Sequence, residues 1–545
     1  MIRKLLATAL LFLLLLSVSI SVQQCATPTP PRGGDRDTLG PVLVLEESTP
    51  NFQTDFRPEE IRLTFDEWVE LDPAQEIIVS PPLPLEGDNR PELQRKSLVI
   101  PLEGLELRDS VTYVVNIGAA IKDFNEGNPT ENLRFVFATG PELDTSEVSA
   151  TVVDAYTGEP IEGAALTLYD NLSDTAVFTQ NPTYFAQTDE AGQVTVSNVK
   201  PGTYRVVGLL RTPGARNYYA DFTGFYPPTA VGFLDSTIEV GEGTTQVGAL
   251  RLSPVPVEPR IADFESDRFG VLKIAVNQVA ENVDISSQQE YLRSDFGDTI
   301  RLYYRTPASD TILIGRDSSY SDTLFFSGTD AGTEPLLPLT AIDKSAGRIN
   351  PARGARLLFN RPIEAIDTSL ITLYRDTLRL PTAYTVTIDS LYPAQLRIDA
   401  NWSAEVPYEL EVLPGAITDW YGRNNPDSIV RVLNAASTES FGTLTIDLLN
   451  LNGTVNYILR LLDAQGEVIT GTQRFISERF DYRAVYLGLQ PATYRMELIY
   501  DSNNNGRWDV GDIGFGTQPE LVRRFEIEPL RANWEVEKII DLENN

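Results

Sequence analysis

The sequence predicts an all-β protein, a series of antiparallel β-sandwiches behind a cleaved signal peptide. Short apolar–polar alternations recur along the chain, and proline, glycine, asparagine and aspartate separate them, which is typical of sandwich strands and their turns. No long amphipathic helix is predicted after the leader. The 545 residues suggest about three to five domains. A hydrophobic fraction of 42% is enough to give each domain a core.

The amino terminus has the layout of a secretory signal peptide. A basic start at residues 1–4 precedes an uninterrupted apolar run, Leu5–Ile20. This run has 16 residues, fewer than the roughly 20 that a permanent membrane-spanning helix needs. Cys25, the sole cysteine of the chain, follows shortly afterwards. We therefore predict a signal peptide over residues 1–24 and an extended Pro-, Gly- and Thr-rich tether over residues 25–40.

The position of Cys25 resembles the lipobox of bacterial lipoproteins, in which the signal is cut before a cysteine that then carries the lipid. Gln24 departs from the small residue that usually precedes this cysteine. Envelope lipoproteins of the Bacteroidetes type are looser here, and the Pro-Thr-rich segment with the Gly33-Gly34 pair is similar to theirs. The resemblance implies an N-terminal lipid on Cys25, an outer-membrane location and the membrane as a partner. The alternative is an ordinary cleaved signal with an incidental cysteine.

Composition excludes several classes of function. The net charge of −33 argues against nucleic acid as a partner, because phosphate contacts need clustered Lys and Arg. The chain has no histidine and no cysteine beyond Cys25, which excludes Ser-His-Asp and Cys-His nucleophiles, His/Cys zinc sites and internal disulfides. The remaining chemistry would depend on paired carboxylates, as in glycoside hydrolysis, or on oxygen-ligated calcium or magnesium. We predict that the protein is not an enzyme.

Residues 41–140 are predicted to form the first domain. Strand-like runs recur within it at short intervals; they are Ile61–Phe65, Glu76–Ser80, Ser97–Leu102, Tyr113–Ile117 and Arg134–Gly140. The segments LTFDEWVEL, VSPPL, YVVNIGAAIKDFNEGNP and FVFATG resemble the bacterial Ig-like domain of the S-layer-protein type. The resemblance implies an antiparallel sandwich directly behind the anchor.

Residues 147–253 are predicted to form the second domain. We expect β-hairpins at Thr188–Val196 and at Val199–Val206, where Gly192 and Gly202 permit the reversals. This succession of strands and turns resembles the carboxypeptidase-regulatory-like or collagen-adhesin B-type β-sandwich.

Residues 256–338 contain β-like runs but no identifying motif. The predicted strands are Val271–Val276, Thr299–Tyr304, Thr311–Ile314 and Thr323–Phe326. We expect a further β-sandwich, which the sequence does not assign to a family.

The chain then repeats its first domain. Ala355–Ile363 parallels the stretch around Phe65, and Tyr408–Pro426 parallels Tyr113–Pro129 at nearly the same spacing. Residues 341–437 are therefore predicted to form a second Ig-like domain.

The second domain is repeated as well. Gly442–Asp447 parallels its first strand, and Leu487–Glu497 parallels its Pro-Gly-Thr-Tyr hairpin. Residues 438–545 are therefore predicted to form a second regulatory-like sandwich.

The segment DSNNNGRWDVGD, residues 501–512, has the pattern of a twelve-residue calcium loop. Oxygen ligands fall at positions 1, 3, 5, 7, 9 and 12, which are Asp501, Asn503, Asn505, the carbonyl of Arg507, Asp509 and Asp512. Gly506 permits the sharp turn, and Trp508 is expected to pack the loop onto the sandwich. Asp512 is shorter than the usual glutamate, which predicts a modest affinity. The alternative is an Asn-Gly-rich turn that needs no metal.

Two other groups of residues are weaker site candidates. Asp66, Glu67 and Glu70 crowd one loop, yet glycosidase carboxylates face each other at roughly 5–10 Å across a deep cleft, which small sandwiches seldom form. An aromatic cluster follows in the second domain; its members are Tyr218, Tyr219, Phe222, Phe225 and Tyr226. We interpret this cluster as a packed loop, with a sugar- or protein-binding loop as the alternative.

These features together predict a non-catalytic, lipid-anchored cell-envelope protein with a structural or binding role. Calcium in the 501–512 loop would stiffen a turn rather than catalyse a reaction. The alternatives are a carbohydrate-binding or carbohydrate-processing protein with its site in the middle domain, and a surface adhesin or assembly factor. The protein or glycan partner and the membrane face are left open by the sequence.

Overall fold

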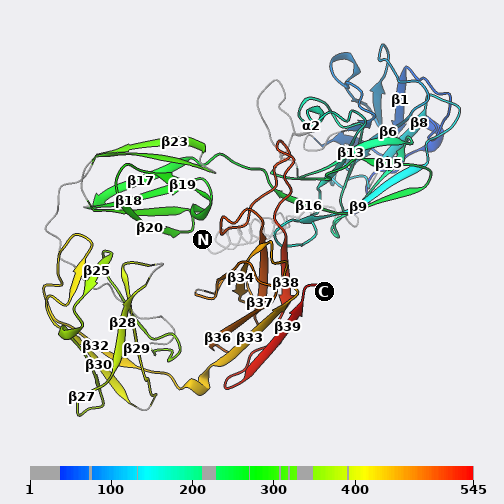
Figure 1. The fold of residues 1–545 in the computed structure, drawn as a ribbon. Coiled ribbons are helices and arrows are strands. Elements are labelled where there is room, and N and C mark those ends of the chain that lie inside the picture. Colours follow the sequence, from blue (N-terminus) through cyan, green and yellow to red (C-terminus); the bar gives the residue numbers. More distant parts are fainter. Residues whose placement is uncertain are drawn as a thin grey trace, which may run out of the picture. The chain divides into compact units, whose positions relative to one another are not determined.

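The computed structural model of the protein (Figure 1) describes residues 37–543 apart from ten internal segments, which are 73–76, 132, 211–228, 269, 306–308, 317–318, 328–347, 390–391, 405 and 470. The predicted signal peptide, Cys25, most of the tether and the aromatic cluster at 218–226 lie outside the described residues.

The prediction of an all-β fold is confirmed. Beyond isolated 3-10 turns, the described residues contain a single α-helical turn, α2 (Ala176–Thr179). None of the described helices has the length and apolarity needed to cross a membrane. The chain divides into two compact units, one holding residues up to Thr145 with Asn198–Lys200, the other holding Ser146–Ser197 with Pro201 onward.

The first unit contains one β-sandwich, the first sandwich. One sheet has the order β1 (Glu60–Thr64), β5 (Ser97–Pro101), β4 (Glu92–Gln94), and the other has the order β3 (Ile78–Ser80), β6 (Thr112–Gly118), β8 (Leu133–Ala138). A short pair, β2 (Val69–Leu71) with β7 (Ile121–Asp123), lies at their edge. Strand alternation buries one side of each sheet, and Tyr113 stacks on Phe137 in the core with ring centroids 5.2 Å apart.

The second unit opens with the second sandwich. Its strands are β9 (Ser146–Asp154), β10 (Ala165–Tyr169), β11 (Tyr184–Gln187), β12 (Gln193–Val199), β13 (Gly202–Leu210), β14 (Ala230–Phe233), β15 (Ile238–Val240) and β16 (Thr244–Pro254). They follow the order β11-β10-β13-β14-β16-β9-β12, with β15 paired to β13. First and last strands, β9 and β16, run parallel to each other. The expectation of a purely antiparallel sandwich is therefore wrong at this one pair.

The two predicted hairpins of the second sandwich are also wrong. Gly192 does make a turn at φ +70°, but β11 pairs with β10 while β12 pairs in the sheet of β9. The turn before Gly202 likewise leads from β12 to β13, which pairs with β10 and β14 instead. Both turns carry the chain from one layer to the other, because each layer buries its own apolar face against the opposite one.

The middle sandwich follows, and its predicted strands are confirmed. One sheet has the order β17 (Ile261–Arg268), β18 (Val271–Val276), β21 (Thr299–Tyr304), β20 (Tyr291–Phe296). The other has the order β19 (Asp284–Ser286), β22 (Asp310–Arg316), β23 (Ser319–Phe326). Aliphatic side chains from both sheets, among them Ile274, Leu302 and Ile314, form its core.

The fourth sandwich has the strand connectivity of the first. One sheet has the order β24 (Ala355–Leu358), β29 (Gln395–Ala400), β28 (Tyr384–Ile388). The other has the order β27 (Leu380–Pro381), β26 (Ile371–Arg375), β30 (Pro407–Val412), β32 (Ile429–Asn434). The short pair is β25 (Ile363–Ile366) with β31 (Ile417–Asp419).

An aspartate ends the second strand of the short pair in both sandwiches. The Asp123 carboxylate accepts the amides of Glu126, Gly127 and Asn128, and that of Asp419 accepts those of Tyr421 and Arg423. Burial acts to raise the pKa of Asp123, but the amide donors outweigh it and lower the pKa to about 2.

The last sandwich repeats most of the connectivity of the second, but it has no counterpart of the β14–β16 pairing that joins the layers there, and its two sheets are separate. One sheet has the order β36 (Tyr482–Leu489), β33 (Gly442–Leu449), β39 (Glu535–Asp541), and the other has the order β35 (Arg474–Ile476), β34 (Asn456–Leu462), β37 (Arg495–Asp501), β38 (Val522–Glu526). The first and last strands, β33 and β39, again run parallel. The predicted Leu487–Glu497 hairpin is wrong for the same reason as in the second sandwich, because β36 pairs with β33 and β37 pairs with β34.

A carboxylate lies fully buried in the last sandwich. Glu497 of β37 has no exposed surface. Its Oε2 accepts Nε and Nη2 of Arg524 at 3.1 and 2.9 Å, and its Oε1 lies 4.0 Å from Arg460. The hydroxyl of Tyr156, from the second sandwich, donates to the same Oε1 at 2.8 Å. Two arginines and one phenol therefore compensate a charge that water cannot reach.

Replacing Glu497 by Gln should destabilise the last sandwich by about 3–5 kcal/mol, because two arginines would lose their buried counter-charge. Glu537→Gln is the control, since its ion pair with Arg483 is about half exposed and should contribute about 1 kcal/mol or less. A chain of several sandwiches does not unfold in two states, so hydrogen exchange of peptides from β34 and β37 is the measurement. Equal exchange in both variants would contradict the prediction.

Candidate functional site: the loop between strands β37 and β38

The predicted calcium loop connects two paired strands of the last sandwich. β37 ends at Asp501, and β38 begins at Val522, which pairs with Ile499. The loop reverses sharply at Asn504 and Gly506, which have φ of +59° and +78°. Glycine is favoured in this left-handed conformation because it lacks a Cβ, and asparagine tolerates it.

Asp501 organises the reversal. Its side chain is 3% exposed, and its Oδ1 and Oδ2 accept the amides of Asn505 and Gly506 at 3.0 and 2.9 Å. A carboxylate that accepts backbone amides in this way fixes the turn without any side-chain partner.

Three further predicted ligands converge beside it. The Nδ2 groups of Asn503 and Asn505 both donate to Oδ2 of Asp509, at 2.7 and 2.6 Å. The Oδ1 atoms of the two asparagines accept loop amides instead. The Arg507 guanidinium lies 3.5 Å from the other oxygen of Asp509, so hydrogen-bond donors surround this carboxylate.

Asp512 takes part in the next turn. Its Oδ1 accepts the amides of Gly514 and Phe515 at 2.8 and 3.3 Å. The structure therefore brings Asp501, Asn503, Asn505 and Asp509 into one turn and gives the Asp512 carboxylate a separate set of donors.

Glu520 is a loop residue that the sequence pattern did not identify. It is 7% exposed; its Oε1 accepts the amide and hydroxyl of Ser502, and its Oε2 accepts the amide of Asp509. Burial and the Asp509 charge raise the pKa of Glu520, against the opposing effect of these hydrogen bonds. The only sequence signal was an acidic residue two positions before β38, and the twelve-residue pattern does not extend that far.

Trp508 packs the loop as expected. Its Nε1 donates to the carbonyl of Glu520 at 2.9 Å, and its ring lies 5.0 Å from that of Tyr156 in an edge-to-face contact.

The oxygen atoms of the loop could bind a hard cation such as calcium on one condition. Two carboxylates and two amide oxygens are available, and calcium binds such oxygens. Asn503 and Asn505 would have to rotate their amides so that oxygen rather than nitrogen points towards Asp509. Within the described parts of the chain, no three acidic, histidine or cysteine side chains are grouped closely enough to hold a metal on their own.

The three acidic residues of the first sandwich, Asp66, Glu67 and Glu70, have separate surroundings. Oδ1 of Asp66 accepts the amide of Val42 at 3.0 Å, while Glu70 forms an ion pair with Lys122 at 3.1 Å. Burial and the nearby Asp123 raise the pKa of Glu67.

Comparison with protein families gives one match. The family described as SpaA, a prealbumin-like fold domain, matches residues 146–209, which span β9 to most of β13. The second sandwich therefore has a prealbumin-like, Ig-type fold. A comparison with curated proteins found no match.

Comparison with solved structures gives distant matches. BcpA, the major pilin subunit of Bacillus cereus, is 11% identical over 73% of this chain and 99% of its own, with a TM-score of 0.14. The TIE protein of Bacillus anthracis is 10% identical over 94% and 76%, with a TM-score of 0.14. A DUF3823 family protein of Bacteroides uniformis is 12% identical over 54% and 100%, with a TM-score of 0.13. Likenesses at this level carry no argument about function.

The raised pKa of Glu520 predicts a pH dependence for the last sandwich. Folded protein holds the Glu520 proton more tightly than unfolded protein, so its contribution to stability is present below the unfolded pKa and is lost as pH rises through the folded pKa. Glu520→Gln cannot titrate. The melting temperature of the variant minus that of the unsubstituted protein should therefore increase between about pH 4 and 7.

The measurement is fluorescence during heating in a background where Trp508 is the single tryptophan left of the five, in chelator so that no metal contributes. A difference between the two proteins that is constant across this pH range would contradict the prediction.

Proposed function

We propose that this chain is a non-catalytic lipoprotein of the cell envelope, of the Bacteroidetes type, held to the outer membrane by a lipid on Cys25. The observation that carries the proposal is the sole cysteine of the chain, which lies five residues beyond the end of a leader-like apolar run at Ile20 and precedes a Pro-, Gly- and Thr-rich tether. The tether would hold the sandwiches away from the membrane surface. Their role is structural or binding, towards a protein or glycan partner.

The β-sandwich architecture supports a role without catalysis. Three acidic side chains of the middle sandwich are engaged with cations or hydroxyls. Glu265 pairs with Lys273, and Asp295 pairs with Arg293 at 2.8 Å. Asp310 accepts the hydroxyl of Ser287. A carbohydrate-processing site would instead need two carboxylates facing each other across a cleft, so these contacts favour the structural or binding role.

Attachment depends on how many acyl chains Cys25 carries. A single acyl chain binds a membrane weakly and reversibly. A mature bacterial lipoprotein cysteine usually carries three, and the anchor is then durable.

Mass spectrometry of the mature amino terminus tests the anchor. We expect the unsubstituted protein to begin at Cys25 with an added lipid mass and to fractionate with membranes. Cys25→Ala should carry no lipid and leave the membrane fraction. A lipid-free protein that begins at another residue would overturn the proposed localisation.

We also propose that the 501–512 loop binds Ca²⁺ with modest affinity. Asp501, Asn503, Asn505 and Asp509 would hold the ion, with the Arg507 carbonyl and Asp512 as the remaining predicted ligands. The ion would stiffen the turn between β37 and β38, and it has no part in a reaction.

A calcium titration followed by melting temperature, and by fluorescence in the background that keeps Trp508 as its single tryptophan, tests this proposal. Calcium should change both signals, and a chelator should reverse them. Asp509→Asn should remove the response, because it replaces a carboxylate ligand by an amide. Asp463→Asn is the control: Asp463 accepts the amides of Gln465 and Glu467 in another turn of the same sandwich. An unchanged signal in the unsubstituted protein would refute calcium binding.

A further inference from the structure

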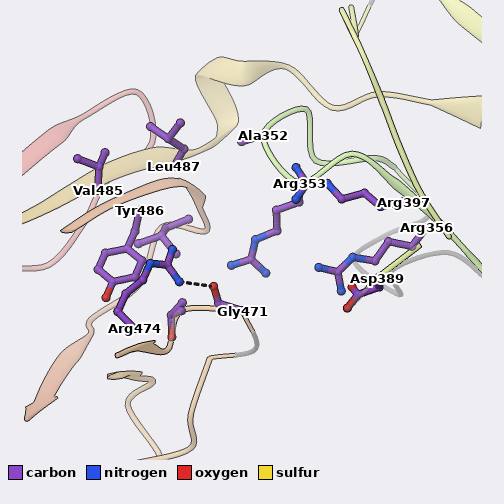
Figure 2. Close-up of a pocket in the computed structure, with 12 residues that line it drawn as sticks. Ala352, Arg353, Arg356, Asp389, Arg397, Gly471, Arg474, Val485, Tyr486 and Leu487 are labelled. Atoms are coloured by element: carbon purple, nitrogen blue, oxygen red, sulfur yellow. Dashed lines mark hydrogen bonds between the residues drawn. The ribbon is translucent and has the colours of Figure 1, made fainter. Parts of the chain in front are cut away.

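A cavity of about 330 Å³ lies where the fourth and last sandwiches meet, within the second compact unit (Figure 2). Small-molecule sites usually occupy about 300–1,000 Å³, so this cavity suits a small ligand. The fourth sandwich contributes Arg353, Arg356, Asp389 and Arg397 to the lining, and the last contributes Arg474 with an apolar surface.

The charge of the lining is opposite to that of the chain. Four guanidinium groups line the cavity against a single carboxylate, that of Asp389, although the chain as a whole has a net charge of −33. Figure 2 shows Arg353 extending from one side of the cavity towards Arg474 on the other. Clustered arginines in a recess attract and orient oxyanions.

Two of the arginines occupy paired positions on neighbouring strands of one sheet. Arg356 on β24 is the direct register partner of Arg397 on β29, and like charges in this position destabilise a sheet. The first sandwich, which has the same strand connectivity, lacks this pair. There Arg62 lies opposite Val99 and forms an ion pair with Glu60 at 3.1 Å.

The nearby carboxylates leave much of this charge uncompensated. Arg397 forms an ion pair with Asp399 at 2.8 Å. Oδ1 of Asp389 accepts the amide of Tyr392, and its Oδ2 accepts Nε2 of Gln395. Among the described residues, no ion pair joins Arg353 or Arg356 to an acidic side chain.

The surface contributed by the last sandwich combines a cation with apolar groups. Nη1 of Arg474 donates to the carbonyls of Gly471 and Gln473, and its guanidinium lies 5.2 Å from the ring centre of Tyr486. The Tyr486 hydroxyl is buried and has no hydrogen-bond partner. Val485 and Leu487 also line the cavity and are 46% and 58% exposed. A ligand with an apolar or carbon-rich part would cover these two side chains.

The junction that forms the cavity is closely packed. Nδ2 of Asn350 donates to the carbonyl of Gly488 at 2.6 Å. A Cβ at Gly488 would approach Oδ1 of Asn350 to 2.6 Å and Cβ of Ala352 to 2.7 Å. Gly488 also has φ +65°, so both the space and the backbone conformation favour glycine there. This contact holds Arg353, three residues beyond Asn350, against the last sandwich.

We propose that this cavity binds a small organic polyanion, a compound with two or more carboxylate or phosphate groups on a carbon skeleton. The arginines would bind the oxyanions, and Val485 and Leu487 would pack against the skeleton. The ligand would also relieve the repulsion between Arg356 and Arg397. This binding is independent of the lipid anchor and of the calcium loop.

Isothermal titration of the full chain with citrate, fructose 1,6-bisphosphate, digalacturonate and inorganic phosphate tests the proposal. At least one of the three organic anions should bind more tightly than inorganic phosphate, and binding should weaken as salt is raised. The double variant Arg353→Gln/Arg356→Gln should bind about tenfold or more weakly. Arg375→Gln is the matched control, because Arg375 lies exposed at the end of β26 in the same sandwich and does not line the cavity.

Hydrogen exchange of peptides from β24 and β29 without ligand separates a binding role from a structural one. Removing Arg356 should leave their protection unchanged or raise it, because the like-charge pair disappears; Arg474→Gln tests the other side of the cavity independently. The proposal is overturned if no organic anion binds at 10 mM, a concentration of probe chosen to detect weak sites. Equal weakening in Arg375→Gln and in the double variant would also overturn it, since only overall charge would then matter.

Discussion

Parallel pairing of a first strand with a last strand is the constraint on which much of this architecture depends. β9 pairs with β16 in the second sandwich, and β33 pairs with β39 in the last. Parallel neighbours cannot be joined by a short hairpin, so the intervening chain has to cross between layers before it returns. In the last sandwich these crossings place β36 at a sheet edge, where Val485 and Leu487 line the cavity, and leave a long loop between β37 and β38.

Buried and clustered charge is the second theme of the structure. The acidic excess of the chain is tolerated at the surface, where water and salt screen it. Inside, charges occur with compensation: Glu497 contacts Arg460, Arg524 and Tyr156, and Asp419 lies 3.5 Å from Arg361 with both side chains almost fully buried. The partly buried arginines of the cavity differ from these pairs, because they outnumber the carboxylate that lines the cavity with them.

Local patterns predicted the strands well. The alternation at Ile61–Phe65, Ser97–Leu102 and Thr299–Tyr304 gave strands at or within a residue of those positions, since side chains on opposite faces of a strand have opposite environments. The turn at Gly192 was predicted correctly, whereas the strands that pair with each other on either side of it were not. A glycine turn specifies a reversal of direction, and the layer in which the next strand pairs depends on residues far along the chain.

The two candidate sites show the same difference between features that a local pattern predicts and features that depend on distant residues. Six ligands were predicted in the loop: Asp501, Asn503, Asn505, the Arg507 carbonyl, Asp509 and Asp512. The structure shows the Asp501, Asn503, Asn505 and Asp509 side chains in one turn, whereas Asp512 binds amides of the next turn. Glu520 and the arginine cavity were not predicted, since their groups meet only through strand register and through the junction at Gly488. The sequence by itself determined the β-rich architecture, its internal repeats and the local loop. The tertiary structure alone decided strand partners, buried ion pairs and the cavity, because each of these depends on long-range contacts that no local pattern encodes.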